Sequence, residues 1–387
     1  MDLALTQEQQ MIREQARELA LLELSPRAAE VDSYYLFPWD GVKSLAEAGF
    51  LGMLVPPQLG GSGADLLSFC LVAEEVAKGC ANTALVFVTH IAACQGLVMG
   101  GKAELKGAWL PPLARGEKLA AWAATEPDTG ANVLATQTTA RRDGESYILR
   151  GTKIYITSAD EAALYLVVVR TGGPGPQGLS LLALEKETGG MSFGRKFLRL
   201  GMNGTSSGEM FLADSPAPAG NLVGAEGGYL PLGFAMAGIG MVGAAAIALG
   251  LAQASLESAV LHAKQRVVAG QPLGNFQGVQ FAISEMGVGV EAARHLLYWA
   301  VDRLSQRAPG PPLPAYQAKL FATEMAARVT DKALQVHGGQ GYTREYPIER
   351  YYRDVRGLTL HFGPSEVIKD FLGKAALGLL PTIEPSR

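Results

Sequence analysis

The sequence predicts an α+β protein in which a helical N-terminal region is followed by a β-rich middle region and a helical C-terminal region. Apolar residues recur at helical spacing in the first and last regions, whereas short runs of β-branched and aromatic residues fill the middle. A chain of 387 residues is long enough for two or three domains. We therefore expect an N-terminal helical domain over residues 1–119, an antiparallel β-domain over 120–228 and a helical domain over 229–387.

A helix start opens the first region. Thr6 precedes Glu8 and Gln9, and a threonine oxygen can accept hydrogen bonds from the free amides of a first helical turn. After proline and glycine breaks, helices are predicted at 66–78 and 83–99.

The middle region alternates short strands with turns. Strands are predicted at 136–140, 146–150, 153–157, 163–170, 179–184 and 209–212. The sequences Arg142-Asp143-Gly144-Glu145 and Gly151-Thr152 are typical of turns, so we expect the second and third strands to be separate.

Long helices return in the last region, at 229–268, 275–307, 315–337 and 364–379, with a proline-rich connector at 308–314. Residues 230–254 carry no charge, but glycines interrupt them and a charged helical segment follows directly. A buried helix therefore explains them better than a membrane span. The charged N-terminus shows no signal-peptide pattern, and we expect a cytoplasmic protein.

Composition excludes several function classes. A net charge of −4 gives no reason to expect a nucleic-acid partner, so a phosphate-bearing ligand would need local donors. Cys70, Cys80 and Cys94 are odd in number and form no CxxC pair, which argues against a disulfide framework or a zinc site. We therefore expect no metal site. We expect the three cysteines to be buried and to pack as small apolar residues.

Three stretches carry possible chemistry. The segment 122–132 is a glycine-containing polar loop after an apolar strand, and its amides could bind a flavin edge or a diphosphate. Tyr155 and Thr157 face the same side of a predicted strand and could stack on and hydrogen-bond a flavin ring. The third stretch, 335–341, exposes amides at consecutive glycines. Taken singly, each is equally an ordinary turn, core strand or helix cap.

Together, in this order and spacing, the three stretches resemble the acyl-CoA dehydrogenase family from about Leu5 to Lys374. In that family the first stretch reads TEPxAGSD, the second WIT, and the third Q-x-x-G-G-x-G followed by EYPxE and RD. The second and third stretches are close to these motifs, whereas Ala131-Asn132 replaces the Ser-Asp of the first. The resemblance implies that family's three-domain fold, with a C-terminal four-helix bundle, and FAD as the cofactor.

The resemblance also implies roles for individual residues. Flavin-lining positions, and others that reach the FAD of a neighbouring subunit, make a homodimer or homotetramer the expected assembly. The implied cofactor-binding residues are Trp122, Thr125, Gly130, Ala131, Tyr155, Thr157, Arg266, Phe276, Gln277, Gln335, Gly338, Gly339, Pro364 and Ser365. The implied partners are an acyl-CoA or acyl-carrier-protein substrate, and an electron-transfer flavoprotein or oxygen as electron acceptor.

The sequence departs from the family at the catalytic base. The family's glutamate precedes a Gly-Thr-Ser segment, and Phe362 stands at that position here. In some members the base lies on the first C-terminal helix beside an arginine, and Gly240 and Met241 match those two positions. Neither phenylalanine nor glycine can accept a proton, so standard fatty-acyl dehydrogenation is not expected.

Three functions remain open at this point. The first is a flavin oxidoreductase acting on an acyl thioester, with His361 or Glu366 as candidates for a relocated base. The second is a flavin-dependent monooxygenase on the same fold in a natural-product pathway, which needs no such base. The third is a non-catalytic FAD-binding protein.

Overall fold

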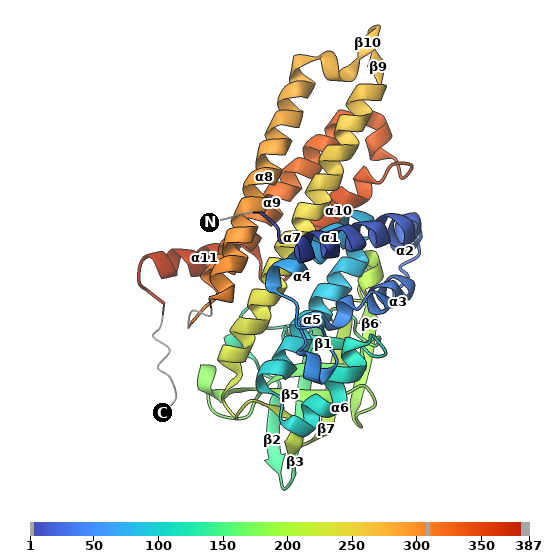
Figure 1. Ribbon diagram of the computed structural model, residues 1–387. Helices are drawn as coiled ribbons and strands as arrows, with labels where there is room; N and C mark the ends of the chain where they lie inside the picture. Colours follow the sequence, from blue (N-terminus) through green and yellow to red (C-terminus); the bar gives the residue numbers. More distant parts are fainter. Residues whose placement is uncertain (1–3, 307–309, 381–387) are drawn as a thin grey trace.

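The computed structural model describes residues 4–306 and 310–380. Within the described residues, helices form the N- and C-terminal regions and a β-sheet forms the middle, so the predicted fold class is confirmed. In Figure 1 the sheet lies at one end of the molecule and a long helical bundle extends to the other.

The N-terminal helices are α1 (Gln7–Leu19), α2 (Ala28–Ser33), α3 (Trp39–Glu47), α4 (Leu66–Gly79), α5 (Ala81–Gly100) and α6 (Ala103–Ala114). Thr6 caps α1 as expected: its hydroxyl accepts from the Gln9 amide, and the Gln9 side chain accepts from the Thr6 amide. Helix α5 is buried along most of its length and forms the centre of this region.

The sheet is built from β1 (Ala120–Ala123), β2 (Thr139–Asp143), β3 (Ser146–Ile156), β4 (Leu164–Arg170), β5 (Leu179–Glu185), β6 (Met191–Lys196), β7 (Gly208–Pro218) and β8 (Leu222–Val223). Its order is β6-β7-β3-β2-β4-β5-β8, with β1 beside β4. The sheet is mixed rather than antiparallel throughout, because β1 and β2 both pair with β4 in parallel.

Strand β3 differs from the expected pair of short strands. It runs unbroken through Gly151-Thr152, with a register shift at Leu149/Arg150 against β7. A Cβ on Gly151 would meet the Cα and Cβ of Thr138 at 2.7 Å. The glycine therefore permits a close approach of two chain segments, and it does not form a turn.

The C-terminal region contains α7 (Tyr229–Gln265), α8 (Gln277–Ser305), α9 (Leu313–His337), α10 (Ile348–Leu358) and α11 (Ser365–Ala376). A small hairpin of β9 (Val267–Val268) and β10 (Gln271–Pro272) links α7 to α8 at the tip of the bundle (Figure 1). Helix α9 begins two residues earlier than predicted because Pro314 is accepted in its first turn, where no backbone donor is needed.

Two helices, α5 and α7, are long and apolar enough to cross a membrane by length and composition alone. Both are mostly buried inside the protein, as the glycine-rich sequence of α7 predicted. Their glycines serve close packing: a Cβ on Gly243 would overlap Val88 of α5, and one on Gly250 would overlap the Glu74 carbonyl of α4. The two helices are therefore the common core of the N- and C-terminal regions.

Candidate functional site

A buried ion pair between Lys153 and Glu126 joins the loop after β1 to β3. Lys153 has no exposed surface, and its Nζ donates to Glu126 Oε1 at 2.8 Å and to the Ala124 carbonyl at 3.3 Å. The Ile154 amide also donates to the Thr125 carbonyl at 2.9 Å. These bonds bring Thr125, from the first predicted stretch, beside β3, which carries Tyr155 and is followed directly by Thr157.

The Glu126 carboxylate also accepts hydrogen bonds from the amides of Gln137 and Thr138, at 2.7 and 2.9 Å. Burial opposes its ionisation, but the charge and hydrogen bonds of Lys153 and these donors outweigh that effect and lower the pKa of Glu126. Burial lowers the pKa of Lys153 to about 8, against the attraction of Glu126. Both groups are therefore charged at neutral pH, and they hold the loop in place.

Two polar atoms of the segment 122–132 are buried, Trp122 Nε1 in β1 and Thr129 Oγ1 in the loop. Trp122 Nε1 and Thr129 Oγ1 make no hydrogen bond of standard geometry with the described residues. A buried donor without a partner is costly, so such groups mark positions where a ligand can supply the missing acceptor. The segment therefore fits a polar cofactor.

The second stretch presents an aromatic surface. Tyr155 is 59% exposed, has a left-handed φ of 56°, and its ring lies 4.9 Å from the ring of Phe197. Thr157 is buried at the end of the same segment. An exposed tyrosine in an unfavourable backbone conformation is held there by its surroundings, which suits a ring-stacking position.

The two positions that the resemblance assigns to a catalytic base meet in space. Phe362 has a left-handed φ of 53°, and a Cβ on Gly240 would overlap its ring, so the ring covers Gly240 on α7. Met241 is buried, and its Cε lies 3.9 Å from where a Cβ on Gly363 would stand. The wall formed by Gly240, Met241 and Phe362 is apolar.

His361 lies beside this wall, partly buried, with its Nδ1 2.8 Å from the Gly357 carbonyl. Burial lowers its pKa to about 4, helped by the nearby charges of Arg199 and Lys319. The imidazole is neutral at pH 7, with Nδ1–H donating to the carbonyl and Nε2 left to accept. A conjugate acid with so low a pKa makes it a weak base.

The other residues of this segment lie at the start of α11. Pro364 precedes the helix, Ser365 is buried with its amide donating to the Thr359 carbonyl, and Glu366 is an exposed first-turn carboxylate. A carboxylate in the first turn of a helix lies near the positive end of the helix dipole.

A second group of predicted residues gathers at the far tip of the bundle. Arg266 caps α7, Phe276 and Gln277 start α8, and Gln335, Gly338 and Gly339 lie at the end of α9. The ends of α7 and α9 adjoin, since the rings of His262 and His337 stack at 4.5 Å. Arg266, Gln277, Gln335 and both glycines are exposed.

The two groups lie far apart within one chain. Gly240 and Arg266 are on α7 and its cap, and 26 residues at about 1.5 Å each separate them by about 39 Å. Arg266 and Phe362 therefore belong to two separate parts of the chain's surface. Gly130 and Ala131 lie with the first group, in an exposed part of the loop.

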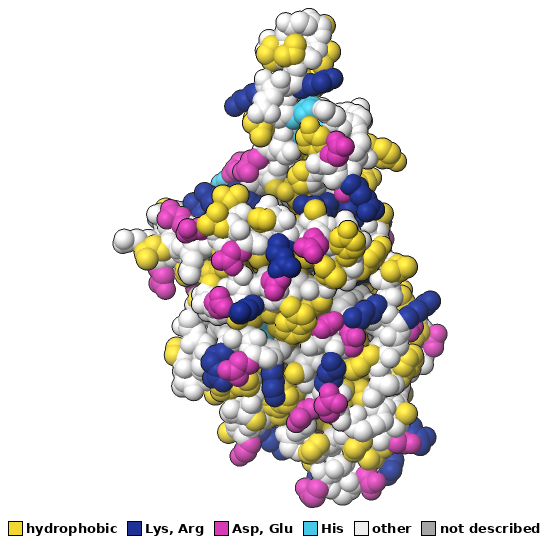
Figure 2. All heavy atoms as spheres, turned by 90° about the vertical axis from the view of Figure 1, so that its right-hand side faces the viewer, with side chains coloured by type: hydrophobic (Ala, Val, Ile, Leu, Met, Phe, Trp, Pro, Cys, Tyr) yellow, Lys and Arg dark blue, Asp and Glu magenta, His cyan; other side chains and the backbone are white. Residues whose placement is uncertain are grey.

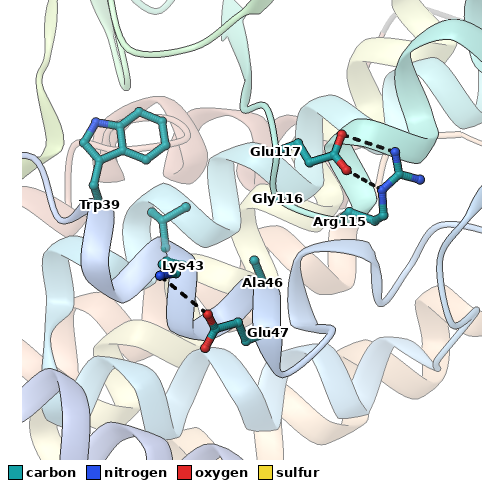
Figure 3. A pocket seen from close by; sticks show the side chains of 8 residues that line it. Trp39, Lys43, Ala46, Glu47, Arg115, Gly116 and Glu117 are labelled. Carbon is teal, nitrogen blue, oxygen red and sulfur yellow. Dashed lines mark hydrogen bonds and ion pairs between the residues drawn. The ribbon is translucent and has the colours of Figure 1, made fainter.

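A surface hollow elsewhere contains none of the predicted residues. It has a volume of about 320 Å³ and is lined by residues of α3 and of the chain after α6 (Figure 3). Its charges neutralise one another in the pairs Lys43–Glu47 and Arg115–Glu117. Among the described residues no cluster of histidine, cysteine and acidic side chains could hold a metal, and the three cysteines are free and buried.

Sequence reasoning missed two buried lysines, Lys153 and Lys319. Both have no exposed surface. A signal existed for Lys319, because helical spacing from the buried Ala315, Ala322 and Ala326 places it on the inner face of α9. For Lys153 the partner Glu126 is distant in sequence, and no local pattern joins them.

Sequence comparison identifies the family. The models of the N-terminal, middle and C-terminal domains of acyl-CoA dehydrogenase match residues 6–117, 121–215 and 236–377. The short-chain specific acyl-CoA dehydrogenase of Clostridium acetobutylicum is 37% identical over 371 residues, which cover 95% of this chain and 98% of that protein.

Solved structures agree. Butyryl-CoA dehydrogenase from Megasphaera elsdenii has a TM-score of 0.94 at 34% identity, covering 97% of this chain and 100% of the other. A structure described as PigA with FAD and proline has a TM-score of 0.93 at 28% identity, covering 98% and 100%.

The chain belongs to the acyl-CoA dehydrogenase family. The predicted resemblance is thus confirmed, and so is FAD as the cofactor of the family to which the chain belongs. The family's chemistry is oxidoreduction of acyl thioesters. When bound, the flavin would supply hydride acceptance, and Trp122, Thr125, Tyr155 and Thr157 would hold its ring.

Proposed function

We propose that this protein is an FAD-dependent oxidoreductase that acts on an acyl thioester, carried by CoA or a carrier protein, and does not perform standard fatty-acyl desaturation. The observation that supports the second part is the contact between Phe362 and Gly240. The resemblance assigns the catalytic base to the position of Phe362 or to that of Gly240. Neither residue can accept a proton, and the Phe362 ring covers Gly240. Loss of a general base typically costs about 10²–10⁴-fold in rate.

His361 and Glu366 are the candidates for proton transfer in this proposal. His361 is neutral at pH 7 but weakly basic, because its pKa is lowered to about 4. Glu366 is exposed in the first turn of α11. Neither has the position and basicity of a strong base, so the favoured substrates are those whose oxidation needs little base assistance.

A flavin-dependent monooxygenase is the second candidate function. The apolar wall of Gly240, Met241 and Phe362 favours it, because reaction of reduced flavin with oxygen needs no carboxylate at the α-carbon. A protein that binds FAD without catalysis is the remaining alternative.

Anaerobic mixing of the FAD-loaded protein with a panel of acyl-CoA thioesters distinguishes these candidates. Bleaching of the flavin absorbance by a thioester alone supports the oxidoreductase. Flavin that is reduced only by an external reductant, and then oxidised by oxygen with product formation, supports the monooxygenase. Rapid desaturation of straight-chain acyl-CoA would contradict the proposal, since it would reveal a base elsewhere.

We further propose that the protein acts in the cytoplasm as a homodimer or homotetramer in which Arg266, and Gly338 and Gly339 directly after α9, contact a partner's FAD. The length of α7 between Gly240 and Arg266 supports a shared cofactor. Charges of both signs are interspersed over the face in Figure 2, in keeping with the net charge of −4 and with no nucleic-acid partner.

A further inference from the structure

Lys319 is a buried cation that the chemistry proposed above does not use. Its side chain has no exposed surface, and its Nζ donates to the carbonyls of Thr359 and Gly363, at 3.2 and 2.7 Å. The acidic residue nearest to it in sequence on α9, Glu324, pairs instead with Lys369 of α11. The ammonium is therefore stabilised chiefly by two main-chain oxygens.

Those two carbonyls stand at the ends of the segment 359–363, which carries Phe362. Within it Phe362 and Gly363 have left-handed φ values of 53° and 108°. A phenylalanine keeps this conformation only where its surroundings hold it. A buried charge is costly unless it is hydrogen-bonded, and an apolar side chain would fill the same space at less cost. The contact with the segment explains why a lysine stands here.

We propose that Lys319 is a positioning residue that holds both ends of the segment 359–363 and so keeps the Phe362 ring against Gly240. It sets the shape of the wall that faces the acyl group, without touching the substrate. The role of that wall rests on the proposed function, whereas the hold on the segment does not.

The first test measures the segment itself. Hydrogen–deuterium exchange of the FAD-loaded protein is followed for peptides covering 357–364 in wild type, Lys319→Met and Lys332→Met. Lys332 is the matched control, because it lies on the same helix in a more exposed pair with Glu285. We expect exchange in 357–364 to rise by about tenfold or more only in Lys319→Met.

The second test asks whether Lys319 acts through Phe362. Butyryl-CoA is titrated into each FAD-loaded variant, and its Kd is read from the flavin absorbance. Lys319→Met should weaken binding by about tenfold. In a Phe362→Ala background the same substitution should change the Kd little, a result that a merely structural lysine would not give.

Unchanged exchange in Lys319→Met would overturn the proposal, as would equal effects of that substitution with and without Phe362. If Lys319→Met does not fold, Lys319→Gln keeps a shorter donor and replaces it in both tests. If wild type binds no thioester, the proposed function fails, and the exchange experiment still decides the role of Lys319.

Discussion

Lys153 and Glu126 bring opposite charges together in the interior of the middle region, and their hydrogen bonds determine where Thr125 lies relative to β3. We expect Lys153→Met to destabilise the protein by about 3–5 kcal/mol, because it leaves the Glu126 carboxylate buried without its cation. Urea denaturation measures the change.

Arg150→Met is the matched control for this substitution. Arg150 lies on the same strand in an exposed pair with Asp214, and such pairs contribute about 0–1 kcal/mol. Equal losses in the two variants would show that burial of the Lys153–Glu126 pair is unimportant.

His361 makes the stability of the folded protein depend on pH, and the direction of this dependence follows from the pKa of the imidazole. The value is about 6.5 in the unfolded chain and about 4 in the folded protein, so between these values the unfolded state binds more protons. Stability contributed by the neutral imidazole is present above pH 6.5 and is lost as the pH falls toward 4. We expect His361→Gln to reduce this acid sensitivity, measured as urea midpoints at pH 7.5 and 4.5. Parallel midpoints in both proteins would contradict the shift.

Phe362 is the residue at which restoration of a carboxylate can be tried. We expect Phe362→Glu to give little or no α,β-desaturation of straight-chain acyl-CoA, because Met241 and Pro364 also depart from the residues that the resemblance implies at this site. Anaerobic flavin reduction measures the outcome, with Phe362→Gln as an isosteric control. Rapid reduction by Phe362→Glu alone would indicate a standard enzyme that has simply lost its base.

At the scale of elements, α7 packs through its glycines against α4 and α5. A Cβ on Gly250 would overlap the backbone oxygen of Glu74, which cannot move aside as a side chain can. We expect Gly250→Ala to destabilise the protein by about 1–3 kcal/mol through overpacking. Thermal or urea unfolding measures it.

Gly373 of α11 supplies the control for that prediction. It is exposed, and a Cβ there would meet nothing within 4 Å. Gly373→Ala should be neutral or stabilising by up to about 1 kcal/mol, since alanine is the better helix former. If Gly250→Ala is equally harmless, the close approach of α7 to α4 is not needed.

At the scale of the whole molecule, the last prediction concerns the assembly of subunits. Arg266 lies about 39 Å along α7 from Gly240, and we expect its guanidinium to bind the diphosphate of a partner's FAD. Arg266→Ala should lower FAD occupancy and weaken the oligomer together, because cofactor binding and assembly are linked. Cofactor absorbance and sedimentation measure the two effects.

Arg303→Ala is a suitable control, because Arg303 is a cation near the opposite end of α8 from the tip. Unchanged FAD occupancy in Arg266→Ala would show the assignment to be wrong. Loss of assembly in Arg303→Ala would show that any lost surface charge has the same effect.

Periodicity and caps are local, and the sequence alone therefore determined the succession of a helical, a β-rich and a helical region, the start of α1 at Thr6 and the buried character of α7. The three motifs, read together, also determined the family and its cofactor. The helices, the cap and each single motif depend on residues a few positions apart, where spacing fixes which side chains share a face.

Tertiary structure alone decided which distant residues meet. Parallel pairing of β1 and β2 with β4 made the sheet mixed, and the approach of Thr138 made Gly151 part of a strand. Glu126 pairs with Lys153 in the interior. The Phe362 ring covers Gly240, which lies 122 positions earlier in the sequence. Contacts of this kind arise from packing of whole elements against one another, so no local pattern of residues records them.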